Sequence, residues 1–153
     1  MELGGTEIPK PSRHVAPVYQ KWYSMNKREQ KPLIFVGSSR KDLREFPEDV
    51  QHVVGFALLA AQRGGKHPDA KPLKGTGDFS GADILEVVED WRGNTYRAVY
   101  TVRYRGAVYV LHAFQKKSKQ GVKTPQADIK LIKQRLRDAK AIHEQLFGKE
   151  DKP

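Results

Sequence analysis

The sequence of 153 residues contains no cysteine. It can therefore form neither a disulfide framework nor a thiolate metal site, and this composition is typical of a cytoplasmic protein. No uninterrupted apolar run approaches the roughly 18 residues of a membrane span, so we expect no association with a membrane. The N-terminus also lacks the apolar core of a secretory signal peptide.

Motifs for cofactors and for common enzyme classes are missing as well. There is no GxxxxGK[ST] phosphate-binding loop and no GxGxxG turn, so we expect no cofactor. No GxSxG nucleophile elbow occurs. The five histidines do not have the spacing of metal ligands, so we expect no metal site.

What the chain has in excess is positive charge: 28 lysines and arginines against 18 aspartates and glutamates, a net charge of +10. The excess is concentrated between Lys116 and Lys140, where nine basic residues accompany two aspartates. Such clustering is typical of proteins that bind nucleic acids. The alternative is a solvated basic helix that only keeps the protein soluble.

Composition divides the chain into three parts. Residues 1–31 contain several prolines and no sustained apolar period, and we expect them to be an N-terminal extension. Residues 32–148 carry periodic apolar residues and should form one domain, which leaves residues 149–153 as a tail.

Within the domain, helices and strands follow from the spacing of apolar residues. The run at 33–36 predicts a strand, and the capping-box spacing from Ser39 to Asp42 predicts a helix start. Pro47 should interrupt that helix or begin a second one, and a buried helical face should continue from there to a stop at Gly64–Gly65. Residues 66–82 are rich in proline, glycine and lysine and predict a long loop.

The C-terminal half predicts three strands and a helix. The strands are expected at 84–88, 96–104 and 107–114, and the last two should be joined by the two-residue turn Arg105–Gly106. Pro125 opens a basic helix with an apolar stripe. The whole order predicts an α+β fold: a small antiparallel sheet, made of a meander plus an N-terminal strand, packed by N-terminal helices and the basic C-terminal helix.

The predicted turn fixes which residues share a face of the hairpin. Tyr100 should face Leu111, and Val102 should face Tyr109, on an apolar side that packs on the helices. The opposite side should carry Arg97 across from Phe114, with His112 diagonal to Arg97 and Lys116 continuing the alternation. Val108 and Val110 are expected on this second side too. We expect it to face open solvent, with both cations available to a polyanion.

Each of these residues has a structural alternative. Arg97 suits phosphate contact but could instead form a salt bridge with Glu86 or Glu89. His112, among apolar neighbours, is more often a structural residue than a proton donor. Phe114 could stack on a base or merely cover the end of the sheet. Lys116 and Lys117 could be an ordinary solvated pair.

A succession of motifs resembles a known group of proteins. KPLKG is followed by a strand with Leu-Glu, then by TYRAVY, then by VLHAFQKKS, and finally by Thr-Pro and a basic helix. Over residues 32–142 this order resembles the RelE/HigB toxin superfamily, and within it the phage-derived subgroup.

The resemblance implies the toxin half of a bacterial type II toxin–antitoxin pair. Such toxins are typically metal-independent endoribonucleases that cut messenger RNA at the ribosome, and a HigA-like helix-turn-helix antitoxin holds them inactive. It implies a RelE-like fold and assigns phosphate stabilisation to Arg97, with Lys116 or Lys117 and the loop residue Lys74 as further basic site residues.

The full set of predicted site residues combines these two lines of reasoning. Predicted to be catalytic are Arg97, Lys116, Lys117, His112 and Glu86, with Glu86 as the candidate base and His112 as the candidate acid. Predicted to bind RNA are Lys74, Phe114, Lys119, Lys123 and Arg103. Two alternatives remain: a ParE-like toxin that inhibits gyrase, and a nucleic-acid-binding protein of the same fold without enzymatic activity.

Overall fold

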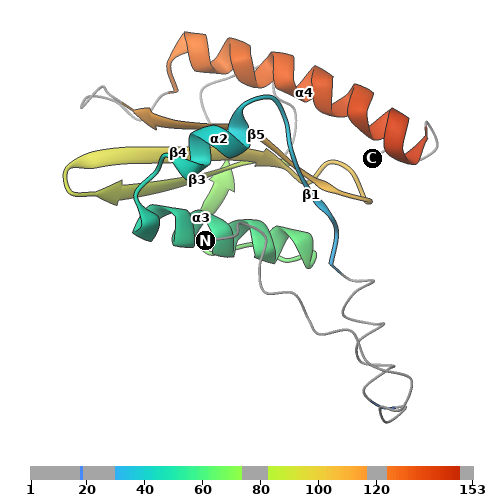
Figure 1. Ribbon diagram of the computed structural model, residues 1–153, viewed down its shortest axis with the longest axis horizontal. Coiled ribbons are helices and arrows are strands. Elements are labelled where there is room, and N and C mark those ends of the chain that lie inside the picture. Colours follow the sequence, from blue (N-terminus) through green and yellow to red (C-terminus); the bar gives the residue numbers. More distant parts are fainter. Residues whose placement is uncertain (1–17, 19–29, 74–82, 117–123, 149–153) are drawn as a thin grey trace.

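The computed structural model describes residues 18, 30–73, 83–116 and 124–148 (Figure 1). The elements, in chain order, are β1 (Leu33–Phe35), α2 (Ser39–Arg44), α3 (Glu48–Gln62), β2 (Ala70–Pro72), β3 (Ile84–Trp91), β4 (Asn94–Thr101), β5 (Val108–Lys116) and α4 (Gln126–Phe147). The strands form one sheet in the order β1-β5-β4-β3-β2. β1 runs parallel to β5, and the other neighbours are antiparallel. This confirms the predicted α+β fold, with its meander and N-terminal strand.

The sheet lies between helices, with α3 on one face and α4 on the other (Figure 1). One core cluster joins Leu58 of α3 to Tyr100 of β4, and the second joins Ile132 of α4 to Val99 of β4. Tyr100 is fully buried, and this burial raises its pKa to about 12. Because both faces are covered, the central strands β4 and β5 are almost continuously buried rather than alternating between buried and exposed residues.

The register between β4 and β5 confirms only part of the predicted hairpin. Arg97 faces Phe114, as predicted, but Tyr100 faces Val110 rather than Leu111. Leu111 is therefore the extra residue of a β-bulge, which adds one residue to one strand and shifts every later pair.

The bulge reverses the predicted faces of four residues. Val108 and Val110 pack in the cluster beneath α3, whereas Tyr109 and Leu111 pack in the cluster beneath α4. The prediction for these four was wrong because the bulge shifts the part of β5 that precedes His112 by one residue relative to β4, and a one-residue shift moves side chains to the opposite face.

The connections also differ from the prediction. β4 and β5 are joined by residues 102–107, not by Arg105–Gly106 alone. β4 ends at Thr101, whose Oγ1 donates to the carbonyl of Asp83 at 3.0 Å and accepts from the amide of Arg103 at 3.1 Å. A two-residue turn occurs instead between β3 and β4, at Arg92–Gly93, with φ values of 49° and 81°. Paired positive φ angles are those of a type I′ hairpin turn.

Two further segments bear on the predicted boundaries. The region predicted as one long loop contains β2, a three-residue edge strand paired with β3. Its Pro72 is compatible with an edge position, where the missing amide costs no ladder bond. α3 begins after Pro47 and ends before Gly64, as predicted. Within the described residues, no helix combines the length and apolar character needed to cross a membrane.

Candidate active site

The face of the sheet beneath α4 collects polar side chains in three rows that run across β3, β4 and β5. Directly paired residues share a face, and so do residues two positions apart along a strand. The rows are Glu86–Val99–His112, Val88–Arg97–Phe114 and Asp90–Thr95–Lys116. Of the five predicted catalytic residues, the four that the structure describes therefore lie on one face.

Arg97 and Glu86 form a buried ion pair at the centre of this face. Arg97 Nη1 lies 3.2 Å from Glu86 Oε2, and it also donates to Thr124 Oγ1 at 3.3 Å. Arg97 is 3% exposed and Glu86 7%. Of the alternatives open from sequence, an ion pair with Glu86 is thus the one observed.

The burial corrects one expectation. Arg97 and Lys116 do project from the same side of the sheet, but this side does not face open solvent, since Lys116 is only 8% exposed. The prediction failed because α4 covers this face of the sheet, and Thr124, just before α4, reaches Arg97.

His112 is held on both ring nitrogens. Its Nε2 lies 2.7 Å from Asp128 Oδ1 in the first turn of α4, and its Nδ1 lies 3.4 Å from Arg135 Nη1. Because a guanidinium only donates, Nδ1 must accept, and the ring proton then belongs on Nε2, facing the carboxylate. Burial lowers the pKa of His112 below its usual 6.5, although the bond to Asp128 opposes the shift. Burial therefore favours the neutral imidazole.

Phe114, in the second row, lies next to His112 of the first row. Its ring stacks on the imidazole of His112, with a centroid separation of 4.6 Å and an interplanar angle of 19°. Phe114 is half-buried, unlike the buried residues 108–113 that precede it in the strand. An aromatic ring anchored on one side in this way presents a defined surface for stacking.

Arg135 is a site residue that the sequence reasoning missed. It is 8% exposed and links three segments: Nη1 donates to the carbonyl of Leu111 at the bulge at 3.0 Å, and Nη2 donates to Ser38 Oγ at 2.8 Å. Gly37, at φ +58°, leaves room for it, since a Cβ there would lie 2.8 Å from Arg135 Nε. The sequence did contain a signal for Arg135, because it lies beside Leu136 on the apolar side of the helix, where a charged residue needs a partner.

Asp128 and Thr124 were also missed. In the sequence, Asp128 is only one of the two aspartates among nine basic residues, and Thr124 is only the residue before Pro125. Both contacts join residues far apart in the sequence, Thr124 with Arg97 and Asp128 with His112, and no local pattern indicates such pairs.

Of the other predicted RNA-binding residues, the structure describes only Arg103. Arg103 lies in the connection after β4, where its Nε donates to Asp83 Oδ2 at 2.8 Å. The predicted site residues that lie outside the described residues are Lys74, Lys117, Lys119 and Lys123. Among the described residues, no group of three or more histidines and carboxylates is arranged to hold a metal ion.

The arrangement brings together groups with complementary chemistry. Glu86 supplies a carboxylate, Arg97 a planar guanidinium that can bind a phosphate with two hydrogen bonds, and Lys116 an ammonium two residues beyond Phe114. The face can therefore accept a proton, stabilise negative charge and stack on a flat ring.

Comparisons with known proteins give two matches of different weight. No curated protein matches the chain. A chain in the crystal structure of the toxin–antitoxin complex RelBE2 from Mycobacterium tuberculosis is similar over 58% of this chain and 94% of that chain, with 22% identity and a TM-score of 0.35. A similarity of this size does not by itself indicate a shared activity.

The family match is more extensive. Residues 41–137, more than half of the chain, match the family described as phage derived protein Gp49-like (DUF891). The matched segment includes the strands and most of the helix that build the candidate site. The chain belongs to the phage-derived Gp49-like family.

Proposed function

We propose that this protein is the toxin of a type II toxin–antitoxin pair and that it cleaves messenger RNA at the ribosome without a metal ion. The observation that carries the proposal is the gathering of Glu86, Arg97, Phe114 and Lys116 on one face of three adjacent strands. Membership of a phage-derived family and the motif resemblance to RelE/HigB toxins support it.

The reaction is attack of an RNA 2′-hydroxyl on the adjacent phosphate. The proton of the hydroxyl passes to the Glu86 carboxylate, the new P–O2′ bond forms, and the P–O5′ bond breaks. Arg97 stabilises the extra charge on the pentacoordinate phosphorus through hydrogen bonds to its oxygens. The products are a 2′,3′-cyclic phosphate and a free 5′-hydroxyl.

For this chemistry the Arg97–Glu86 pair must exchange partners. With Arg97 Nη1 at 3.2 Å from Glu86, an incoming phosphate takes up hydrogen bonds of the guanidinium and releases the carboxylate toward the 2′-hydroxyl. The RNA phosphate takes the place of the Glu86 carboxylate beside Arg97. The buried guanidinium is therefore never left without a counter-charge.

The acid for the leaving 5′-oxygen is better assigned to Lys116 than to His112. Burial favours the neutral form of His112, and the single ring proton of that form faces Asp128. Lys116 carries the ammonium of the third row, on the same side as Arg97. In this scheme His112 positions Phe114, which stacks on a base and aligns the scissile group.

The proposed partner is a HigA-like helix-turn-helix antitoxin that keeps the toxin inactive. A small helix-turn-helix protein encoded beside this chain would supply it. Co-expression of that protein should restore growth of cells in which this chain is induced.

Induced expression in bacteria tests the proposal. The wild type should arrest growth and produce cuts in translated messages that primer extension locates at codon-linked positions. Arg97→Lys should lose both effects while remaining folded, because lysine keeps the charge opposite Glu86 but not the planar fork of donors. Thermal melting of the purified variant provides the folding control.

The outcome also separates the alternatives. Intact transcripts together with induction of the DNA-damage response would contradict cleavage and favour a gyrase-inhibiting toxin. A protein that binds RNA but produces neither effect would be a non-enzymatic member of the same fold. One observation favours this non-enzymatic alternative: Arg97 is buried in an ion pair, which would suit a purely structural role.

A further inference from the structure

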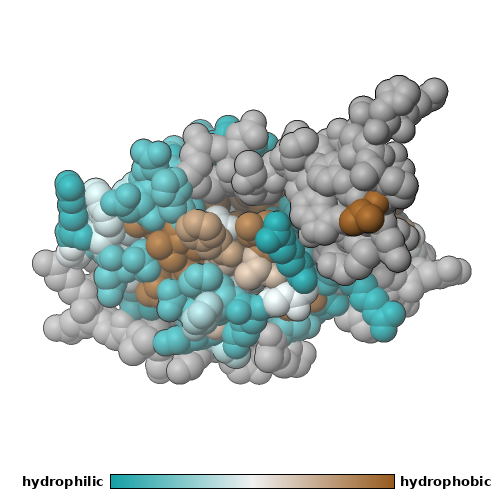
Figure 2. All heavy atoms as spheres, turned by 90° about the horizontal axis from the view of Figure 1, so that it is seen from below, coloured by the Kyte–Doolittle hydropathy of each residue, from teal (hydrophilic) through white to brown (hydrophobic). Residues whose placement is uncertain are grey.

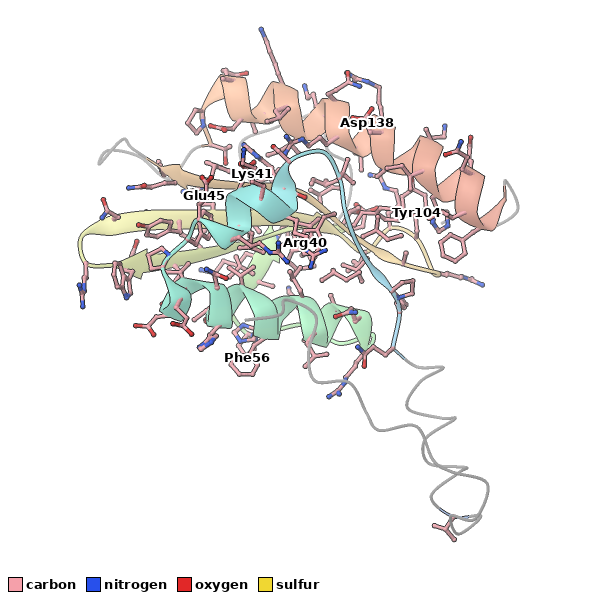
Figure 3. The ribbon with its side chains drawn as sticks, viewed as in Figure 1. Arg40, Lys41, Glu45, Phe56, Tyr104 and Asp138 are labelled. Carbon is pink, nitrogen blue, oxygen red and sulfur yellow. The ribbon has the colours of Figure 1, made fainter. Side chains whose placement is uncertain are left out.

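The outer face of α3 carries an exposed aromatic residue at its centre. Phe56 is 65% exposed, and its ring points away from the sheet (Figure 3). Seen from the side on which α3 lies, the molecule shows a group of apolar atoms surrounded by polar ones (Figure 2). A large apolar side chain this exposed is among the few in the described residues, and it marks a candidate interface.

The residues around Phe56 form a continuous stripe along the helix. They recur at steps of three and four residues, so all of them lie within an arc of about 120° around the helix axis. The stripe consists of Asp49, His52, Val53, Phe56, Leu59, Ala60 and Arg63. Its middle is apolar and its two ends are charged. We call it the α3 stripe.

The α3 stripe is complementary to the α3 stripe of a second copy that runs in the opposite direction. Asp49 and Arg63 lie seven positions on either side of Phe56, and both are exposed. In an antiparallel pair of α3 helices with Phe56 on the two-fold axis, Asp49 of one copy meets Arg63 of the other, twice. Val53 then meets Leu59, and the two Phe56 rings meet each other. A surface that fits its own copy in this way is the requirement for an isologous dimer.

We propose that this protein forms a homodimer through the α3 stripe, with the two α3 helices antiparallel. Charge supports this occupant over a nucleic acid. The N-terminal end of α3 carries Glu48 and Asp49, whose carboxylates would repel phosphates, whereas the C-terminal end is followed by Arg63 and Lys66. A parallel pairing would bring like charges together, so the antiparallel arrangement is selected.

The size of the stripe sets the expected strength of the dimer. α3 has 15 residues, and one such helix pair lies at the low end of specific interfaces, which bury roughly 1,200 Å² or more in total. We therefore expect a dissociation constant on the order of micromolar. Because α3 and α4 cover opposite faces of the sheet, the candidate active sites of the two copies stay on the outside of the dimer (Figure 1).

Sedimentation equilibrium of the full chain tests the proposal. Across the micromolar range the mean mass should rise from 17.4 kDa toward twice this value. Phe56→Ser should raise the dissociation constant at least about tenfold, because the two apolar rings at the axis lose their burial. Leu146→Ser is the matched control: Leu146 is 61% exposed on α4, and its replacement should leave the dimer unchanged.

A charge swap tests the antiparallel geometry. Asp49→Arg and Arg63→Asp should each weaken the dimer by placing like charges together, and the double variant should restore it. A wild type that stays monomeric at every concentration overturns the proposal and leaves the α3 stripe to a different protein. Dimers that persist in Phe56→Ser, or that dissociate in Leu146→Ser, overturn it too. So does a double variant that remains as weak as the single ones. None of these results depends on RNA cleavage.

Discussion

At the scale of single residues, the Arg97–Glu86 pair is a buried ion pair for which we have also proposed a catalytic role. A buried ion pair is costly to form, and removal of one partner leaves the other charge in a low-dielectric environment without that counter-charge. The sequence indicated that Arg97 would meet either a phosphate or a glutamate. In the proposed reaction it meets both in turn.

The pair predicts a non-additive stability effect. Glu86→Leu and Arg97→Met should each destabilise the protein by about 3–5 kcal/mol, the usual cost of breaking a buried pair. The double variant should recover most of the loss, because it removes both charges. Urea denaturation measures all three. Losses that simply add in the double variant would show that the two side chains do not interact across their 3.2 Å separation.

His112 predicts a pH dependence of stability. Its folded-state pKa lies below the unfolded value of 6.5, so the unfolded chain takes up the proton first as the pH falls. Stability contributed by neutral His112 is complete above pH 6.5 and is lost as the pH falls from there to the lowered folded pKa. Thermal melts between pH 7.5 and 5 should therefore show a steeper decrease for the wild type than for His112→Gln. Parallel curves would contradict the assignment.

At the scale of elements, local patterns predicted helices better than the hairpin. The apolar period between Pro47 and Gly64 and the proline before α4 placed both long helices closely. The bulge at Leu111 cannot be read from the alternation, because both faces of β5 are buried and residues 107–111, which lead up to it, are all apolar. Where polarity does not distinguish the faces, sequence cannot fix the register.

The turn between β1 and α2 is the element most tightly linked to the site. Gly37 has φ +58°, and a Cβ there would lie 2.8 Å from Arg135 Nε. Arg135 in turn contacts Ser38, Leu111 and His112. A change in the turn should therefore reach the imidazole through one side chain.

This link predicts a difference between two glycines. Gly64 has φ +82°, and a Cβ added there would meet nothing within 4 Å, so Gly64→Ala should cost only the left-handed backbone, about 1–2 kcal/mol. Gly37→Ala should cost clearly more, because it also displaces Arg135. Chemical denaturation of the two variants measures the difference. Equal losses would show that Arg135 moves aside without cost.

At the scale of the whole molecule, the fold separates two surfaces of opposite character. The face beneath α4 gathers the candidate catalytic groups, and the opposite side, on α3, carries an apolar stripe with charged ends. The net charge of +10 indicated a polyanionic partner from sequence alone. It gave no information on where the chain would bury its cations, since that depends on the packing of α4 against the sheet.

The separation predicts that dimer formation and cleavage are independent. Phe56→Ser should cut messenger RNA at the wild-type rate per chain, because the α3 stripe is remote from the face beneath α4. A cleavage assay with equal amounts of the two proteins measures this. A large loss of activity in folded Phe56→Ser would contradict the separation.

The most direct test of the catalytic proposal is the chemistry of the RNA ends. Purified protein added to ribosomes that carry a defined message should leave a 2′,3′-cyclic phosphate upstream and a 5′-hydroxyl downstream of each cut. Arg97→Lys should produce neither end. Downstream fragments with a 5′-phosphate, an uncut message, or equal cutting by folded Arg97→Lys would contradict the proposed attack by the 2′-hydroxyl at Glu86 and Arg97.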